Sequence, residues 1–224
     1  MFENEKPIQK DKLHDQVYER LCTLLRQGEF TPGEAVPVSR VSKAFGISAM
    51  PVREALTRLL AIGVLTNVSG RSVGVPKLSR EELDDLRKVR LEIESTAVKW
   101  AVENRSAAFL DELEAEFAEM TAAEETRDIK RHISANYRFH FCLYRQANSS
   151  VLLDIINTLW LRVSPHLYNL SRGQMYRVSN EHHRAIIEAV RAGDGDAAAH
   201  ALFGDITGAY DDLLKGLFKA EADG

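Results

Sequence analysis

Apolar residues recur every three or four positions through almost all of residues 80–219 of this 224-residue chain. This spacing is typical of helices that bury one face, and no segment in that range alternates apolar and polar residues as a half-buried strand does. Short polar or glycine-containing breaks divide the pattern into six helices, at approximately 80–103, 106–125, 127–147, 149–172, 178–192 and 194–219. The back two thirds of the chain are therefore predicted to form an all-α helical bundle.

The first third of the chain is organised differently. Three short segments with helical apolar spacing are expected there, and Gly46 supplies a tight turn between the second and the third. Two short strands, 65–68 and 72–75, then flank a glycine-containing turn. Three helices followed by a hairpin predict a winged helix-turn-helix. We place this winged domain at residues 8–76 and the helical domain at residues 79–220, so the predicted fold class is mainly α.

The charges are divided unevenly between the two parts. Residues 1–78 carry 11 Lys and Arg against 8 Asp and Glu, although the whole chain has a net charge of −4 and a pI near 6.0. This division favours contact of the front part alone with an anionic partner, although a difference of a few charges also arises by chance. The overall acidity argues against a protein that coats nucleic acid or anionic membranes over its whole surface.

Other features indicate a soluble protein of a reducing compartment. No stretch reaches the ~20 apolar residues that a membrane helix needs, and the polar N-terminus lacks the apolar segment of a signal peptide. Cys22 and Cys142 lie far apart within apolar helical patterns, which is typical of buried thiols rather than of a disulfide framework. We therefore expect a cytoplasmic location.

The predicted winged domain is suited to double-stranded DNA. The major groove admits one helix, and side chains near the N-terminus of that helix reach base edges while its N–H groups favour a phosphate. Arg53 lies one turn into the third helix, and Arg71 at the hairpin tip is placed for the minor groove or the backbone. For Arg58, a solvated surface arginine fits as well as a phosphate contact. The candidate DNA contacts are Arg40, Lys43, Ser48, Met50, Arg53, Arg58, Gly70 and Arg71.

Several polar residues fall on helix faces that are expected to be buried. Asn136 and His140 are stacked i,i+4 on one helix, and His183 and Asp205 occupy similar stripes on two others. Imidazole and carboxylate ligands suit Zn, Ni, Fe or Mn, so a divalent metal ion is one hypothesis for these residues. A hydrogen-bonded network of core residues is the other. His14, His132, His166 and His182 form no such constellation, and we expect them to be packing or surface residues, with His200 exposed.

The front part resembles a known family. The run TPGEAVPVSRVSKAFGISAMPVREALTRLLAIGVLTNVSGRSVGV is similar to the winged-helix domain of GntR-type bacterial transcription regulators, through its PGE turn, its PVREAL segment and its glycine-containing wing. The resemblance implies DNA binding. Ala49 stands where the family usually has an arginine that reads a base, which implies a different DNA sequence for this chain.

The back part resembles the FCD effector domain of the FadR-type branch of that family. NYRFHFCLYRQANSSVL, EHHRAIIEAVRAGDGDAA and VRLEIE are similar to its motifs. The resemblance implies a divalent metal ion bound by an aspartate and three histidines, with a carboxylate metabolite on the metal. Carried over, Asn136 replaces the aspartate, His140 and His183 match, and Asp205 falls where the third histidine is expected. A metal-free site that hydrogen-bonds the effector directly is the alternative.

The effector is expected to contact three further residues, Arg90, Glu94 and Tyr144. Arg90 is predicted to point toward the same interior, where its guanidinium would bind a carboxylate in a bidentate fork. An ion pair with Glu94 at i+4 explains Arg90 equally well.

Three functions follow from these observations. The first is a ligand-responsive transcription repressor, not an enzyme, that binds a pseudo-palindromic operator as a homodimer and responds to a small carboxylate. The second is a metalloenzyme that acts on a small hydroxy or sugar acid and carries a DNA-binding head. In the third, the helical domain serves only dimerisation, and its inward polar residues form a satisfied hydrogen-bond network.

Overall fold

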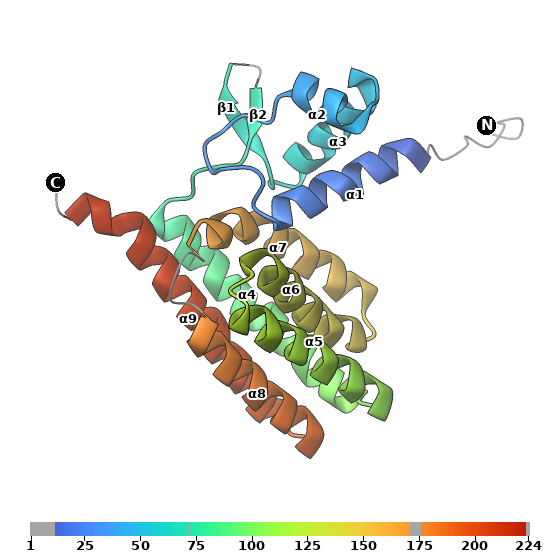
Figure 1. Ribbon diagram of the computed structural model, residues 1–224, viewed down its shortest axis with the longest axis vertical. Helices are drawn as coiled ribbons and strands as arrows, with labels where there is room; N and C mark the ends of the chain where they lie inside the picture. Colours follow the sequence, from blue (N-terminus) through green and yellow to red (C-terminus); the bar gives the residue numbers. More distant parts are fainter. Residues whose placement is uncertain (1–11, 71, 171–175, 223–224) are drawn as a thin grey trace, which may run out of the picture.

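The computed structural model describes residues 12–70, 72–170 and 176–222, which form nine helices and two strands (Figure 1). The front part contains α1 (Lys12–Arg26), α2 (Val38–Phe45) and α3 (Ala49–Ala61), followed by β1 (Thr66–Ser69) and β2 (Ser72–Gly74). The predicted winged helix-turn-helix is therefore confirmed, and the observed strands begin and end within one residue of the predicted strands.

Two glycines shape this part of the chain. Gly46 ends α2 in the left-handed conformation, with φ +67°, and so makes the turn into α3. Gly74 lies at the base of the wing, where Ala35 forms an isolated bridge with it. A Cβ on Gly74 would lie 2.1 Å from the carbonyl oxygen of Glu34, so only glycine allows the two backbones to approach this closely.

The back part is an all-helical bundle, as predicted. Its helices are α4 (Arg80–Glu103), α5 (Ala107–Glu125), α6 (Ile129–Gln146), α7 (Ser150–Leu170), α8 (Tyr176–Ala192) and α9 (Gly195–Ala222). Side-chain caps fix three of the starts. Ser79 and Glu82 form a capping box at α4, Ser106 accepts from the Phe109 N–H at α5, and Asp128 accepts from the Arg131 N–H at α6.

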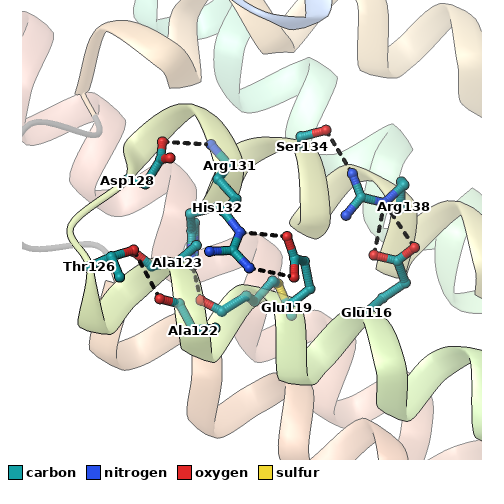
Figure 2. Close-up of polar contacts among 11 residues, drawn as sticks. Glu116, Glu119, Ala122, Ala123, Thr126, Asp128, Arg131, His132, Ser134 and Arg138 are labelled. Atoms are coloured by element: carbon teal, nitrogen blue, oxygen red, sulfur yellow. Dashed lines mark hydrogen bonds and ion pairs between the residues drawn. The ribbon is translucent and has the colours of Figure 1, made fainter.

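Ion pairs along the outside align α5 with α6, as Figure 2 shows. Arg131 donates two hydrogen bonds to Glu119, at 2.6 and 2.8 Å, and Arg138 donates to both oxygens of Glu116 at 2.8 Å. Exposed pairs of this kind contribute little free energy, but the bidentate geometry of the Arg131–Glu119 pair favours one alignment of the two helices. The same alignment positions the inward face of α6, on which His140 lies.

The buried apolar side chains form two cores. One is built from helices α4 to α9, and the other from α1, α2, α3 and the residues around the wing. Leu161 of α7 belongs to the second core, although its helix is part of the bundle. The Arg26 guanidinium of α1 also lies 4.9 Å from the centre of the Tyr137 ring of α6. The two parts are therefore in direct contact through α1, α6 and α7.

None of the helices in the described part of the chain combines the length and the apolar character that a membrane crossing needs.

Candidate metal centre and DNA-binding surface

Two histidines and one aspartate from three helices meet inside the bundle. His140 of α6, His183 of α8 and Asp205 of α9 each offer a ligand atom, and these atoms lie within 4.8 Å of one another. The Nε2 atom of His140 is 3.1 Å from Nε2 of His183 and 3.3 Å from Oδ2 of Asp205. The Nδ1 atom of His183 is 3.8 Å from Oδ1 of Asp205. These three side chains are among those that the sequence placed on inward faces.

The cluster is shielded from solvent. The side chains of His140 and His183 are 2% and 0% exposed, and that of Asp205 is 10% exposed. The Phe139 ring meets the His183 ring edge to face, with the ring centres 4.6 Å apart. Uncompensated polar groups are costly in such a place, so the lone pairs that converge here require a proton or a cation.

The donor set fits a divalent metal ion. Two imidazoles and a carboxylate are borderline ligands that suit Zn and its first-row neighbours. Metal–ligand bonds of about 2.0–2.2 Å place two ligands of one ion about 3.0–3.5 Å apart, which is the separation between His140 Nε2 and its two neighbours. Asn136 lies one turn before His140 on α6 and is half-buried, so its amide remains a predicted fourth ligand.

A second polar cluster adjoins this site and is centred on Glu94 of α4, which is 0% exposed. Arg90 donates from Nε to Oε1 at 2.5 Å and from a terminal nitrogen to Oε2 at 3.2 Å. Trp160 of α7 donates its indole N–H to Oε2 at 3.2 Å, and the hydroxyl of Tyr144 hydrogen-bonds the same oxygen. The Tyr144 oxygen is also 3.3 Å from Nδ1 of His140.

Arg90 therefore forms the ion pair with Glu94 that was one of its two predicted roles. Burial alone would lower the pKa of Arg90, but the adjacent Glu94 carboxylate raises the pKa above its usual value, so the guanidinium stays charged. Burial and the neighbouring Glu94 charge also raise the pKa of Tyr144 well above its ordinary value, which keeps the phenol protonated. The Arg90 charge is thus matched by Glu94 within the protein.

Sequence reasoning missed Trp160. Its indole lies between the two clusters, 4.9 Å from the Arg90 guanidinium and with its ring centre 5.3 Å from that of His140. In the sequence, Trp160 falls on an apolar helical stripe and looks like any other core residue. The one available signal is its polar N–H, which needs a partner when it is buried.

The other histidines lie outside these clusters. His132 and His166 are buried, and Nδ1 of His132 is 3.4 Å from the carbonyl oxygen of Met120. His14 of α1 contacts the Glu54 carboxylate, and His200 is exposed. The two cysteines are free and buried, as expected.

Five of the candidate DNA contacts are exposed on α2 or near the start of α3. Ser48 occupies the N-cap position of α3, Met50 is 70% exposed on the first turn, and Arg53 is exposed one turn later. Arg40 and Lys43 are exposed on α2. The exposed side chains at the start of α3 lie where a major-groove helix presents its base-reading residues.

Three candidates remain, namely Gly70, Arg71 and Arg58. Gly70 has φ +51° in the hairpin turn, as a tight turn requires, whereas Arg71 lies outside the described residues. Arg58 is 44% exposed, as a surface arginine is, and its phosphate contact stays a prediction. It pairs with Asp15 at 3.0 Å and its guanidinium lies 4.0 Å from the centre of the Tyr18 ring, so it also links α3 with α1.

Comparison with known families finds two matches. Residues 13–75 match the family described as bacterial regulatory proteins, gntR family, and residues 85–207 match the FCD domain. The second match alone covers more than half of the chain.

Individual relatives agree with these matches. The chain is 30% identical to the HTH-type transcriptional regulator McbR of Escherichia coli K12, over 84% of this chain and 86% of that protein. It is 28% identical to a probable D-xylose utilization operon transcriptional repressor of Paenarthrobacter nicotinovorans, over 90% of this chain and 89% of that protein. The solved structure of E. coli McbR/YncC superposes with a TM-score of 0.86 and 28% identity, and covers 92% of this chain and 99% of that one.

Proposed function

Because the chain belongs to the GntR family of bacterial regulatory proteins and carries an FCD domain, we propose that it is a repressor controlled by a small carboxylate. The family and the relatives are DNA-binding transcription regulators and not enzymes, so we do not propose catalysis by the buried histidines. The observation that carries the proposal is the combination in one chain of exposed cationic residues at α2 and α3 with a buried His–His–Asp cluster.

We assign DNA contact to the outer face of α2 and α3 and to the wing. Arg53 and Met50 are the proposed base contacts, and Arg40 and Lys43 the proposed phosphate contacts, with Ser48, Gly70 and Arg71 completing the surface. A homodimer would present two such surfaces to the two halves of a pseudo-palindromic operator, in the cytoplasm where the DNA lies. Arg58 pairs with Asp15 of α1 but is 44% exposed, so it is a further proposed phosphate contact.

The proposed ligand site is the cluster in the bundle. Two neutral histidines and one aspartate would leave a divalent ion with a net charge of +1, which favours an anionic effector in the open coordination positions. His140, His183 and Asp205 would hold the ion, and Asn136 is the proposed fourth ligand. Arg90, Glu94 and Tyr144 are bound to one another, so we assign them a supporting role beside the effector rather than direct contact.

Control of DNA binding requires the effector to distinguish two arrangements of the winged domains. The effector shifts the equilibrium only by the difference between its affinities for the two arrangements. The contacts of α1 with α6 and α7 supply a direct physical connection between the two parts.

Selection of binding sites from random duplexes, followed by fluorescence anisotropy, tests the DNA half of the proposal. We expect Arg53→Ala to weaken specific binding by about 10-fold or more, since a good base contact contributes about 1–3 kcal/mol. Arg191→Ala is the matched control, because Arg191 is an exposed arginine of α8 paired with Glu114. Equal affinities for wild type and Arg53→Ala would reject the proposed orientation of α3.

Elemental analysis with a thermal-shift screen of organic acids tests the ligand half. We expect one divalent ion per chain in the wild type and loss of that ion in His140→Ala, His183→Ala and Asp205→Ala. A carboxylate that binds the folded protein raises the unfolding midpoint by mass action, and this rise should require the metal. Variants that retain the metal would reject the site.

A further inference from the structure

Tyr144 and Glu94 are buried beside the proposed metal centre but belong to neither the ligand set nor the DNA surface. We propose that Tyr144, held by Glu94, is a positioning residue that fixes the tautomer of His140 and so presents the lone pair of His140 Nε2 to the metal. This inference rests on the proposed function, because it concerns the same site.

The first step is to account for the hydrogens at Glu94. Arginine and the tryptophan indole only donate hydrogen bonds, and an ionised carboxylate only accepts them. Glu94 already receives two N–H groups from Arg90, at 2.5 and 3.2 Å, and one from Trp160, at 3.2 Å. The Tyr144 hydroxyl contacts the same carboxylate, so its single hydrogen must be donated to Glu94.

The second step follows at the tyrosine oxygen. Having given its hydrogen to Glu94, this oxygen offers only lone pairs to Nδ1 of His140, which lies 3.3 Å away. Nδ1 must therefore carry the imidazole hydrogen. A neutral imidazole has one donor nitrogen and one acceptor nitrogen, so Nε2 is left with its lone pair.

The third step concerns the direction of that lone pair. Nε2 of His140 faces Nε2 of His183 at 3.1 Å and Oδ2 of Asp205 at 3.3 Å. The chain Glu94–Tyr144–His140 thus prepares a metal-binding nitrogen at the point where the other two ligands converge. A hydrogen-bond partner on the second nitrogen is the usual way in which proteins orient a ligating histidine, and its loss typically costs about 10- to 100-fold in metal affinity.

The rival explanation is that Tyr144 and Glu94 only fill the core. Tyr144→Phe separates the two explanations, because it removes one oxygen and retains the ring. The matched control is Tyr210→Phe on α9. Tyr210 is equally buried, and its hydroxyl lies by the Arg90 guanidinium, so the control removes a phenol oxygen beside the same cluster that has no recorded contact with His140 among the described residues.

The tautomer is measured on the full-length, metal-free protein by long-range 1H–15N correlation at about pH 8, where an unperturbed histidine is neutral. We expect the wild type and Tyr210→Phe to carry the His140 hydrogen on Nδ1, and Tyr144→Phe to populate the Nε2–H form. A wild-type His140 with its hydrogen on Nε2 would overturn the inference, as would an unchanged tautomer in Tyr144→Phe.

Competition with a chelator then measures Zn²⁺ affinity for the same three proteins. We expect Tyr144→Phe to bind Zn²⁺ about 10- to 100-fold more weakly and Tyr210→Phe to stay within about two-fold of the wild type. Equal Zn²⁺ affinity in Tyr144→Phe and the wild type would overturn the inference while leaving the proposed function intact. A wild type that binds no divalent ion would overturn the proposed metal centre, and the NMR experiment would still decide the tautomer.

Discussion

Trp160 and Leu161 are neighbours on α7, yet their side chains enter different cores. Trp160 donates to Glu94 and lies against His140, whereas Leu161 is buried among the apolar residues of the winged part. Tyr137 of α6 adds a parallel connection, since its ring contacts Trp160 edge to face at 5.8 Å and lies under the Arg26 guanidinium of α1. Adjacent residues of α7 therefore connect the polar clusters with the DNA-binding part.

Leu161→Ala should loosen this connection. Removal of a buried leucine side chain costs about 2–5 kcal/mol, and here the lost contacts are those between α7 and the winged part. We expect a lower unfolding midpoint and faster amide hydrogen exchange in α1 and α3, with Zn²⁺ affinity within about two-fold of the wild type. Ile155→Ala is the control, because Ile155 lies on the same helix and is 43% exposed. Equal exchange in both variants would contradict the proposed docking role of Leu161.

Ala49→Arg should change the preferred DNA sequence. Ala49 is exposed on the first turn of α3, where the resemblance to GntR-type regulators leads us to expect a base-reading arginine. A new guanidinium there can bind guanine in the major groove, and a good bidentate contact contributes about 1–3 kcal/mol. Site selection with both proteins should show a guanine gained at one position of each half-site. An unchanged consensus would place Ala49 away from the base edges.

Acid should destabilise the protein through His166. Burial in α7 lowers the pKa of His166 from 6.5 to about 4, so between these values the unfolded chain binds a proton that the folded chain does not. The contribution of His166 to the free energy of unfolding should be fully present above about pH 6.5. As the pH drops to about 4, the free energy of unfolding should fall by up to about 3 kcal/mol.

Urea titrations across this range measure the effect. In His166→Phe, the number of protons taken up on unfolding should fall by up to one. In His200→Gln, which alters an exposed histidine, the pH dependence of the unfolding free energy should be that of the wild type. If the unfolding free energy of His166→Phe depended on pH as steeply as that of the wild type, the acid sensitivity would belong to other groups.

The two thiols should be inert in the folded protein. Burial raises the pKa of Cys22 to about 11 and that of Cys142 to about 12, and the thiolate is the reactive form. Alkylation by iodoacetamide at about pH 8 should therefore be slow in buffer and rapid in denaturant, as followed by intact mass. Rapid modification of the native protein would show that one of these segments opens readily.

The helices were predictable because their signals are local. The α4 boundaries match the prediction, 80–103, where Ser79 and two acidic residues mark the start, and α6 begins at a capping aspartate. His140, His183 and Asp205 were found because each interrupts an apolar stripe, and stripes of packed helices face a common interior. The division of the chain at residues 8–76 and 79–220 stays a prediction.

The contacts that depend on packing could not be predicted. The sequence left two partners open for Arg90, and only the arrangement of α4, α6 and α7 shows how Glu94 is surrounded. Arg58 is a surface residue as predicted, but its contacts with Asp15 and Tyr18 could not be predicted, because these residues lie about 40 positions earlier in the chain. Leu161 belongs to an apolar stripe, and nothing in its helix indicates that it packs against another part of the protein.

The carboxylate of Glu94 has a consequence for assembly of the bundle. Its donors come from three helices: Arg90 from α4, Tyr144 from α6 and Trp160 from α7. If α6 or α7 slid by one turn, a buried anion would lose a donor, and an incompletely paired charge in a dry interior is costly. Apolar packing alone tolerates such sliding far better, so this one acidic side chain favours a single register of the three helices over apolar packings of similar energy.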